Sequence, residues 1–418
     1  MRLSNIFTKT RKTVPSDEVS LNAQLLIKAG YIHKEMAGVY SFMPLGLKVI
    51  ENIKDIVREE MNSLGSQELI MTSLQEKELW EKTDRWNDET VDIWFKTELK
   101  NGTELGLAWS HEEQIGNMIK EYISSYRDLP VSVYQFQNKL RNETRAKSGI
   151  LRTREFVMKD LYSFATSDEE HKKFYDEVSA SYQRIFKKVG LGKDTYFTFA
   201  AGGAFTDKFS HEFQTVLDAG EDTIYINKEK NIALNQEVFK DDVIELLGLQ
   251  KDQFEKSKAA EVGNIFSFGT SKSEVLDINF TDKDGVLRPV VMGSYGIGIS
   301  RLMGVIAEYF SDANGLVWPM AVAPYKVIIC SIGNEPEVVK ESEKIYKYLT
   351  DKKIEVIYDD RDVRPGEKFA DADLLGIPLR LVVSQKNIAS NSIEIKERTK
   401  KESHQIKLDE VLSIIEKI

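Results

Sequence analysis

The sequence has little of several features that would define its class at once. Its 418 residues include a single cysteine, Cys330, which excludes an internal disulfide framework and a CxxC metal cluster. Long apolar runs are missing as well, and none approaches the ~20 residues that a membrane-spanning helix needs. A single cysteine fits a reducing compartment, so we expect a cytoplasmic protein without membrane contact.

Positive charge is also in deficit, with 57 Lys and Arg against 67 Asp and Glu and a formal net charge of −10. An acidic total argues against nucleic-acid binding through net charge, although it leaves room for a local basic patch. The 41% hydrophobic and 30% charged residues are typical of a globular protein. The chain is too long for one ordinary core, and we expect two or three domains.

The first residues, MRLSNIFTKTRKT, are basic and contain hydroxyl groups, as targeting peptides often do. They run directly into Asp17 and Glu18 without a small-residue cleavage site. We therefore expect this segment to be part of the first domain.

Apolar periodicity predicts helices over 19–37 and 46–64, and strands over 131–137 and 156–164. Residues 226–260 are rich in Lys, Glu, Asp and Gln, which favours a peripheral helical layer or a surface excursion.

A change of pattern marks a domain boundary at WPMAVAPYK (318–326), which contains two prolines. Beyond it, strand-like and helical segments alternate up to a closing helix over 408–418, which predicts a small sheet with helices packed on it. We expect one domain of mixed α and β structure over 1–320 and a small α/β domain over 323–418.

A basic cluster interrupts the acidic chain at RNETRAKSGILRTREF (141–156). Arg141 and Arg152 can each donate in a planar fork that matches phosphate oxygens. Glu143 lies two residues after Arg141, so on a strand the two side chains share a face, where the carboxylate can accept from an amino group such as that of adenine. Phe156 offers a flat face for a base. The alternative is a solvated basic hairpin with surface ion pairs.

A second element, GSYGIGISR (293–301), places Gly296 and Gly298 where a strand enters a helix and ends on Arg301. Glycines also serve close packing of a strand on a helix, so alone they are weak evidence for a nucleotide. Arg301 stands where a dinucleotide fingerprint needs its last glycine, and the sequence has no GxxxxGK[ST] loop. Taken together, Phe156, the three arginines and Glu143 indicate an ATP site.

At these residues the chain resembles the class II aminoacyl-tRNA synthetases. RNE…RTREF is similar to their second signature, an Arg-x-Glu followed by Arg-xxx-Phe, and GIGISR is similar to their third. The resemblance is closest to the bacterial-type prolyl-tRNA synthetases. It covers nearly the whole chain, in the family's order, through stretches such as ELWEKTDRW, SHEE, SHEF, EVGNIFSFGT and DDRDVRPGEKFADADLLGIPLRLVV.

The resemblance implies an α+β catalytic domain built on an antiparallel sheet, followed by a small α/β anticodon-binding domain. It implies an enzyme, expected as a homodimer, that activates proline with ATP and Mg²⁺, without zinc, and transfers it to the 3′ end of proline tRNA. The implied ATP and catalytic residues are Arg141, Glu143, Arg152, Phe156, Gly298 and Arg301. The implied proline-binding residues are Ser110, Glu112, Arg141, Gly203 and His211, and the implied anticodon residues are Asp360, Arg361, Lys368 and Arg380.

Plainer interpretations stay open for several of these residues. Without the resemblance, His211 would be read as a hydrogen-bonded core histidine, and each charge of the anticodon set as a surface residue. Glu212 is only a weak candidate for a magnesium contact. Cys330 is expected to be a buried strand residue rather than a catalytic thiol.

The chain departs from the family pattern in four places. Thr72 replaces the proline that usually ends the first signature, and Trp109 and Ser110 stand where the family has proline and threonine. Thr206 and Asp207 replace two common glycines. The large editing domain of long bacterial members is expected to be absent, because only about 130 residues separate the second and third signatures.

Two other functions compete with this interpretation. One is a related synthetase for threonine, serine, glycine or histidine, although a threonine enzyme needs a zinc-binding cysteine in its catalytic domain and Cys330 lies outside it. The other is a synthetase-like accessory protein without catalysis, against which the joint presence of Arg141, Glu143, Arg152 and Arg301 speaks.

Overall fold

The computed structural model describes residues 1–144, 146, 148–202, 209–407, 410–411 and 414. Its contacts divide the chain into two compact units. The first comprises Met1–Met36, Tyr40–Ile53 and Ile306–Ile418, and the second comprises Ala37–Val39 and Lys54–Val305. The N-terminal segment, expected in a domain over 1–320, is thus grouped by its contacts with the C-terminal residues.

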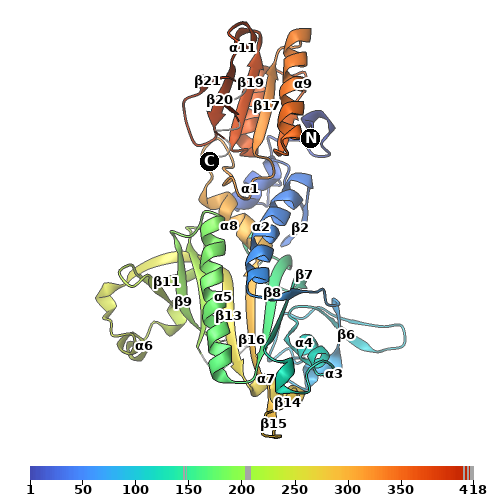
Figure 1. Ribbon diagram of the computed structural model, residues 1–418, viewed down its shortest axis with the longest axis vertical. Helices are drawn as coiled ribbons and strands as arrows, with labels where there is room; N and C mark the ends of the chain where they lie inside the picture. The colour runs from blue at the N-terminus through green and yellow to red at the C-terminus, as the bar shows by residue number, and fades with distance from the viewer. Residues whose placement is uncertain (145, 147, 203–208, 408–409, 412–413, 415–418) are drawn as a thin grey trace. The chain divides into compact units, whose positions relative to one another are not determined.

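A nine-stranded sheet forms the centre of the described part of the second unit (Figure 1). The strand order is β10-β9-β12-β11-β13-β16-β8-β7-β3, with a further pairing of β10 with β13. The long central pairs are antiparallel, as the family resemblance implied, whereas β3–β7 and β12–β9 are parallel. The strands are β3 (Gln67–Glu68), β7 (Val131–Leu140), β8 (Glu155–Ala165), β9 (Thr195–Ala201), β10 (Phe209–Val216), β11 (Asp222–Asn227), β12 (Ile232–Asn235), β13 (Glu255–Gly269) and β16 (Val291–Gly298).

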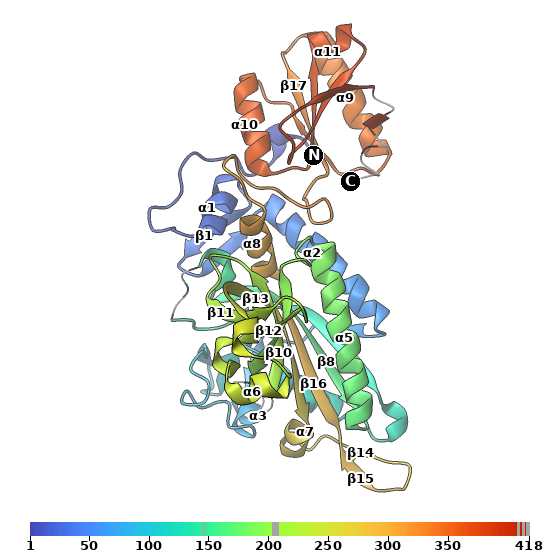
Figure 2. The ribbon, with the colours of Figure 1, turned by 90° about the vertical axis from the view of Figure 1, so that its left-hand side faces the viewer.

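The long helix α5 (Asp168–Lys188) lies along one face of this sheet, against β8, β13 and β16 (Figures 1 and 2). Ser167 caps its start by accepting from the backbone N–H of Glu170, and Tyr182 and Phe186 are buried against Phe213 of β10. The other elements of this unit are β4 (Leu74–Glu76), α3 (Lys77–Glu81), β5 (Lys96–Glu98), β6 (Glu104–Leu107), α4 (Glu112–Ile119), α6 (Asp241–Leu246), α7 (Ser271–Leu276), β14 (Asn279–Thr281) and β15 (Leu287–Pro289).

The first unit contains a five-stranded sheet in the order β18-β17-β19-β20-β21 within its described residues. Parallel pairs join β17 to β18 and β19, so the predicted alternation of strands and helices is confirmed. Cys330 lies fully buried in β17, as expected for a structural cysteine. The elements are α1 (Leu21–Lys28), β1 (Ile32–Met36), β17 (Val327–Ile332), α9 (Pro336–Asp351), β18 (Val356–Asp359), α10 (Pro365–Leu375), β19 (Leu379–Ser384), α11 (Gln385–Ala389), β20 (Ile393–Glu397) and β21 (His404–Ile406).

Three elements contain the bounds of the units, namely β2 (Val39–Phe42), α2 (Pro44–Ser63) and α8 (Ile299–Tyr309). The strand β16 runs directly into α8, so the predicted entry of a strand into a helix at the glycines is confirmed. No helix in the described ranges is long and apolar enough to cross a membrane.

Two predictions of local structure were wrong. The helix expected over 19–37 ends at Lys28, because Gly30 adopts φ +74° and stops it before β1. The helical layer, one of the two alternatives for 226–260, is wrong because α6 is the only α-helix in this described range, and β12 with parts of β11 and β13 pairs into the sheet. Ile224 and Ile226 are buried on one face of β11, a period of two that the surrounding charges mask. The closing helix expected over 408–418 lies largely outside the described residues.

Candidate active site

A cavity of about 290 Å³ opens over the middle of the nine-stranded sheet. Alternate residues of β8 and β16 line it because successive side chains of a strand point to opposite faces. The pairing of β10 with β13 shifts register between Phe213 and Gln214, an irregularity that lets both Glu261 and Asn264 line the cavity. The lining residues are Ser110, Glu112, Lys139, Arg141, Met158, Asp160, Tyr162, Ala201, Gly202, Glu212, Glu237, Glu261, Asn264, Phe266, Ser294 and Gly296.

Three residues predicted from the sequence, Ser110, Glu112 and Arg141, line this one cavity. Arg141 follows the last residue of β7, so it does not share a strand face with Glu143 as expected. Its Nε donates to the Trp109 carbonyl (3.3 Å), and its guanidinium lies 5.1 Å from the centre of the Phe156 ring. Burial, with the like charge of Arg301 nearby, lowers the pKa of Arg141. The site is therefore one in which an anion is electrostatically favoured.

The other charged residues predicted to bind the nucleotide form ion pairs with each other or with a residue that lines the cavity. Arg152 donates from Nε and Nη2 to Glu143 (3.0 and 2.8 Å) and from Nη1 to Glu221 (2.8 Å). Arg301 donates from Nη1 to the carboxylate of Glu261 (3.1 Å), which lines the cavity.

Gly298 ends β16 beside Arg301. A Cβ at position 298 would lie 3.2 Å from the Cβ of Arg301, so a side chain there would crowd this arginine. Gly203, Thr206 and Asp207 lie outside the described residues, whereas Gly202 lines the cavity.

His211 does not line the cavity, which departs from the sequence expectation. Its neighbour Glu212 does, and because side chains alternate along β10, His211 faces the other side of the sheet. There its Nδ1 is hydrogen-bonded to the Tyr175 hydroxyl (2.6 Å), and its ring stacks on Phe197 at 4.4 Å. Burial lowers the pKa of His211 to about 4. These contacts match the interpretation of a hydrogen-bonded core histidine.

Glu112 is held by a buried arginine that the sequence analysis missed. Arg85, 3% exposed, donates to Glu112 Oε2 (3.3 Å) and to both oxygens of Glu113 (2.7 and 2.9 Å). The other oxygen of Glu112 accepts from Ser294 (3.3 Å). Lys272 also donates to Glu113 (2.7 Å), and despite burial the two cations lower the pKa of Glu113 to about 2. This leaves Glu113 fully paired and Glu112 facing the cavity.

Four of the five tryptophans surround Arg85 in one cluster, the tryptophan cage, made of Trp80, Trp86, Trp94 and Trp109. The Arg85 guanidinium lies 4.4 Å from the Trp109 ring and 5.2 Å from the Trp80 ring. Trp109, which departs from the family pattern, therefore contacts Arg85 through its ring and Arg141 through its carbonyl.

A second network begins at Lys139 and Asp160, which line the cavity. Lys139 donates to Asp160 (2.8 Å) and to His111 Nδ1 (2.7 Å), while His111 Nε2 donates to the Thr72 carbonyl (3.2 Å). Burial, together with Lys139, lowers the pKa of His111 to about 3, so the imidazole stays neutral at pH 7. Burial opposes ionisation of Asp160, but Lys139, His111 and the hydrogen bond from Gln135 together outweigh it and lower the pKa of Asp160. Thr72 thus contributes its backbone to this network.

Carboxylates gather at the opposite wall. Burial and then the nearby charge of Glu261 raise the pKa of Glu212 to about 8, and burial also raises the pKa of Asp222. Gln214 donates to both Glu212 (2.9 Å) and Asp222 (2.7 Å). Burial is the largest cause of both raised pKa values, because it penalises the charged form of a carboxylate.

The predicted anticodon residues all have partners inside the first unit. Lys368 is buried, 2% exposed, and donates to the Ser331 and Asp359 carbonyls. Arg361 is paired with Asp359 and Asp371 (2.7 and 2.9 Å). Arg380 lies over the Phe369 ring at 4.5 Å, with a hydrogen bond to Asp373 (3.3 Å).

Asp360 accepts from the Ser4 backbone and hydroxyl (3.0 and 2.7 Å). Lys368, which the sequence offered as an RNA contact, is a structural residue in this conformation because its ammonium is enclosed.

Family models match both parts of the chain: "tRNA synthetase class II core domain (G, H, P, S and T)" over 95–310 and "Anticodon binding domain" over 326–418. A "Proline--tRNA ligase" of Rickettsia akari is 35% identical over 429 residues, covering 99% of this chain and all of that protein. One from Dehalococcoides mccartyi is 33% identical over 565 residues, covering this whole chain and 98% of its own length.

The second alignment is longer than this chain, so the Dehalococcoides protein carries sequence that the chain lacks. Among solved structures, a prolyl-tRNA synthetase from Cryptosporidium parvum, complexed with halofuginone and AMPPNP, matches with a TM-score of 0.79 at 19% identity. The match covers 95% of this chain and 76% of that one, and it supports the fold.

Proposed function

The chain belongs to the proline–tRNA ligases, and from that we propose that the cavity over the nine-stranded sheet is where it activates proline with ATP. The enzyme is an ATP-dependent class II aminoacyl-tRNA ligase that joins proline to tRNA. One observation supports this location of the site: the Glu112 carboxylate, the Ser110 hydroxyl and the Arg141 guanidinium belong to residues that line the same cavity. This set complements the ammonium and carboxylate of an amino acid.

Glu112 pairs with the proline ammonium group, and Arg141 holds the proline carboxylate. Arg85 acts as a positioning residue, because its hydrogen bond to Glu112 Oε2 orients the carboxylate and keeps a counter-charge behind it. The rings of Tyr162 and Phe266 line the same cavity and offer apolar contact to the pyrrolidine ring. His211 has no direct role in this proposal.

ATP binds across Arg141, with its α-phosphate at this guanidinium and adenine on Phe156. Glu143 then accepts from the adenine amino group, while Arg152 and Arg301 contact the outer phosphates. In the structure Arg152 is paired with Glu143 and Glu221, so nucleotide binding exchanges these pairs for contacts to ATP. Arginines that change partner in this way remain charged throughout.

Activation then needs little acid–base chemistry. The proline carboxylate is already ionised, so it attacks the α-phosphate, the bond to the β-phosphate breaks, and pyrophosphate leaves. The chain contributes position and charge: Arg141 touches both reacting groups, and Arg152 and Arg301 neutralise the departing pyrophosphate. Lys139, which is hydrogen-bonded to His111 and Asp160, helps to keep Asp160 ionised and fixes this part of the cavity wall.

The acidic wall fits the Mg²⁺ that family membership implies. Glu212 and Glu261 would hold the ion, because both carboxylates line the cavity and oxygen donors suit Mg²⁺. When bound, the ion neutralises charge on the phosphates.

We propose the functional division of the chain expected from the sequence, with catalysis over 1–320 and anticodon binding over 323–418. The anticodon family model over 326–418 supports the second part. Within it, Arg361 and Arg380 are the candidates for RNA contact, while Asp360 and Lys368 shape the surface through their internal bonds. Homodimerisation and a cytoplasmic location follow from family membership as proposals, and sedimentation velocity tests the first.

The test is ATP–pyrophosphate exchange with proline, threonine, serine, glycine and histidine. We expect exchange with proline, and loss of on the order of 10²-fold in kcat/KM for proline in Glu112→Gln, because a charge-assisted hydrogen bond is lost. Glu121→Gln, an exposed carboxylate beyond the same helix, is the matched control and should behave as wild type. Exchange with another amino acid instead, or none at all, would refute the proposal.

A further inference from the structure

The N-terminal arm, residues 1–12, concentrates positive charge in an acidic protein. It contains Arg2, Lys9, Arg11 and Lys12, and the first acidic residue is Asp17. The chain as a whole carries a net charge of −10, so this run is an exception that invites a polyanionic partner.

The start of the arm is fixed on the first unit. Arg2 forms a parallel bridge with Tyr358 next to the edge strand β18, and the Met1 carbonyl accepts from the Tyr358 N–H (2.9 Å). Arg2 also donates twice to Glu343 (2.5 and 2.7 Å), while Ser4 donates to Asp360. Leu3 and Ile6 are buried. The residues that follow therefore have a defined place beside the β18–α10 loop.

The rest of the arm presents groups that are not used internally. Phe7 is 81% exposed, and Lys9, Arg11 and Lys12 are exposed and form no ion pair with any residue that the structure describes. This contrasts with Lys368 and Arg380, whose charges are satisfied inside the unit. An exposed aromatic ring beside unpaired cations is the pattern with which proteins bind single-stranded nucleic acid.

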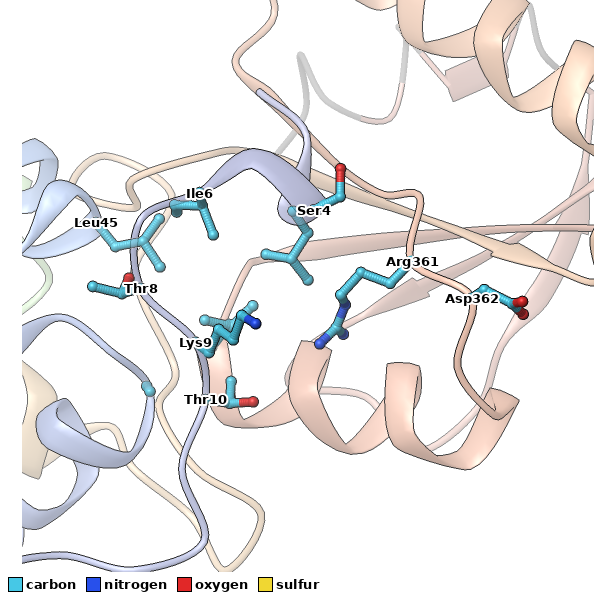
Figure 3. Close-up of a pocket in the computed structure, with 11 residues that line it drawn as sticks. Ser4, Ile6, Thr8, Lys9, Thr10, Leu45, Arg361 and Asp362 are labelled. Carbon is cyan, nitrogen blue, oxygen red and sulfur yellow. The ribbon is translucent and has the colours of Figure 1, made fainter.

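A cavity of about 300 Å³ separates the arm from the β18–α10 loop (Figure 3). Lys9 and Thr10 line it from the arm and Arg361 from the loop, with the Lys9 and Arg361 side chains facing the same opening (Figure 3). The ion pairs of Arg361 use Nε and Nη2, and Nη1 has no hydrogen bond to the described residues. An ammonium, a guanidinium and a hydroxyl at one opening suit a phosphate group.

We propose that the N-terminal arm is an RNA-contact surface of the first unit that binds the anticodon end of the tRNA substrate. Lys9 and Arg361 hold a backbone phosphate at the cavity, Arg11 and Lys12 follow the adjacent phosphates, and Phe7 stacks on an unpaired base. The proposal rests on the proposed function, because it assumes that the RNA partner is the tRNA that receives proline. It extends the anticodon surface beyond residues 326–418.

The test compares two triple variants of the full-length enzyme. Lys9→Ala/Arg11→Ala/Lys12→Ala removes the free charges of the arm, and Lys340→Ala/Lys347→Ala/Lys352→Ala removes three exposed charges elsewhere in the same unit. We expect the arm variant to raise KM for tRNA by on the order of 10-fold. It should also make the slope of log affinity against log salt shallower by about 2, because each phosphate contact to a single strand contributes about 0.7. The control should leave both unchanged.

Phe7→Ala should raise KM for tRNA by on the order of 10-fold with no change in salt slope, because stacking is not ionic. The rate of ATP–pyrophosphate exchange should be the same in all variants as in the wild-type enzyme. If the wild-type enzyme itself shows no exchange, the proposed function is refuted rather than this inference. A tRNA affinity and salt slope equal to those of the control would overturn the inference. So would dissociation of a dimer by the arm variant in sedimentation, which would make the arm an interface between copies of the chain.

Discussion

Replacing Arg85 by methionine tests how the amino-acid site is built. The change keeps an unbranched apolar stem but removes the charge and the three hydrogen bonds to Glu112 and Glu113. Breaking a buried ion pair costs about 3–5 kcal/mol. Lys272 still neutralises Glu113, so we expect the lower end, about 3 kcal/mol of unfolding free energy.

The effect on proline is separate from this loss of stability. Without Arg85, Glu112 keeps only the contact to Ser294 and loses its fixed orientation toward the cavity. A hydrogen bond to a charged group contributes about 1.5–3 kcal/mol, which corresponds to roughly 10- to 150-fold in KM for proline. KM for ATP should stay within about twofold, because Arg85 does not line the cavity.

The matched control is Lys272→Met. Lys272 donates to the same Glu113 but does not contact Glu112, so this variant should lose similar stability with an unchanged KM for proline. The assays are urea unfolding and proline-dependent ATP–pyrophosphate exchange at saturating ATP. If both variants raise KM for proline equally, or neither does, the positioning role of Arg85 is wrong.

Three further predictions follow from the site. Arg301→Lys should lower the rate of proline activation by on the order of 10²-fold with an intact fold, because an ammonium cannot reproduce the planar contacts to Leu151 and Glu261. Near-normal exchange kinetics would contradict the proposed role of Arg301 in ATP binding. The pKa of Glu212 is about 8 in the folded protein and 4.5 in the unfolded chain. Its contribution to stability, on the order of 5 kcal/mol, is therefore present below pH 4.5 and lost as the pH rises through 8. Glu212→Gln should therefore flatten the unfolding free energy measured over this range, and an unchanged slope would show that Glu212 titrates normally. Finally, the enzyme should form some alanyl-tRNA, because each methylene that alanine lacks gives only about 1–3 kcal/mol of discrimination in favour of proline. It should not hydrolyse preformed alanyl-tRNA above the spontaneous rate, and faster hydrolysis would reveal an editing site.

The motifs were sufficient to predict which segments meet at the cavity. Ser110, Glu112 and Arg141 come from separate stretches, yet the structure brings them to one place. Arg85 could have been suspected, because it lies in ELWEKTDRW, a stretch quoted for the resemblance but not assigned a role. Local sequence could not show that it would be enclosed by Trp80 and Trp109, which depends on packing between segments.

His211 shows where a motif misleads. SHEF suggests that its histidine and its glutamate act together, but neighbours on a strand face opposite sides of a sheet. Once Glu212 faces the cavity, His211 must face away from it. The face that each one takes depends on the register of β10 with β9 and β13, which is a property of the whole sheet.

The order and spacing of the motifs by themselves determined the family, the class II core, the anticodon-binding segment and the ATP-dependent chemistry. These properties are readable because each motif is local, with its residues only a few positions apart. Tertiary structure alone decided which charges are available: it buried Lys368, paired Arg152 with Glu143, and set the N-terminal arm beside Arg361. The physical reason is that the burial and pairing of a charge depend on how separate segments pack, and the partner can lie hundreds of positions away, as with Arg2 and Glu343.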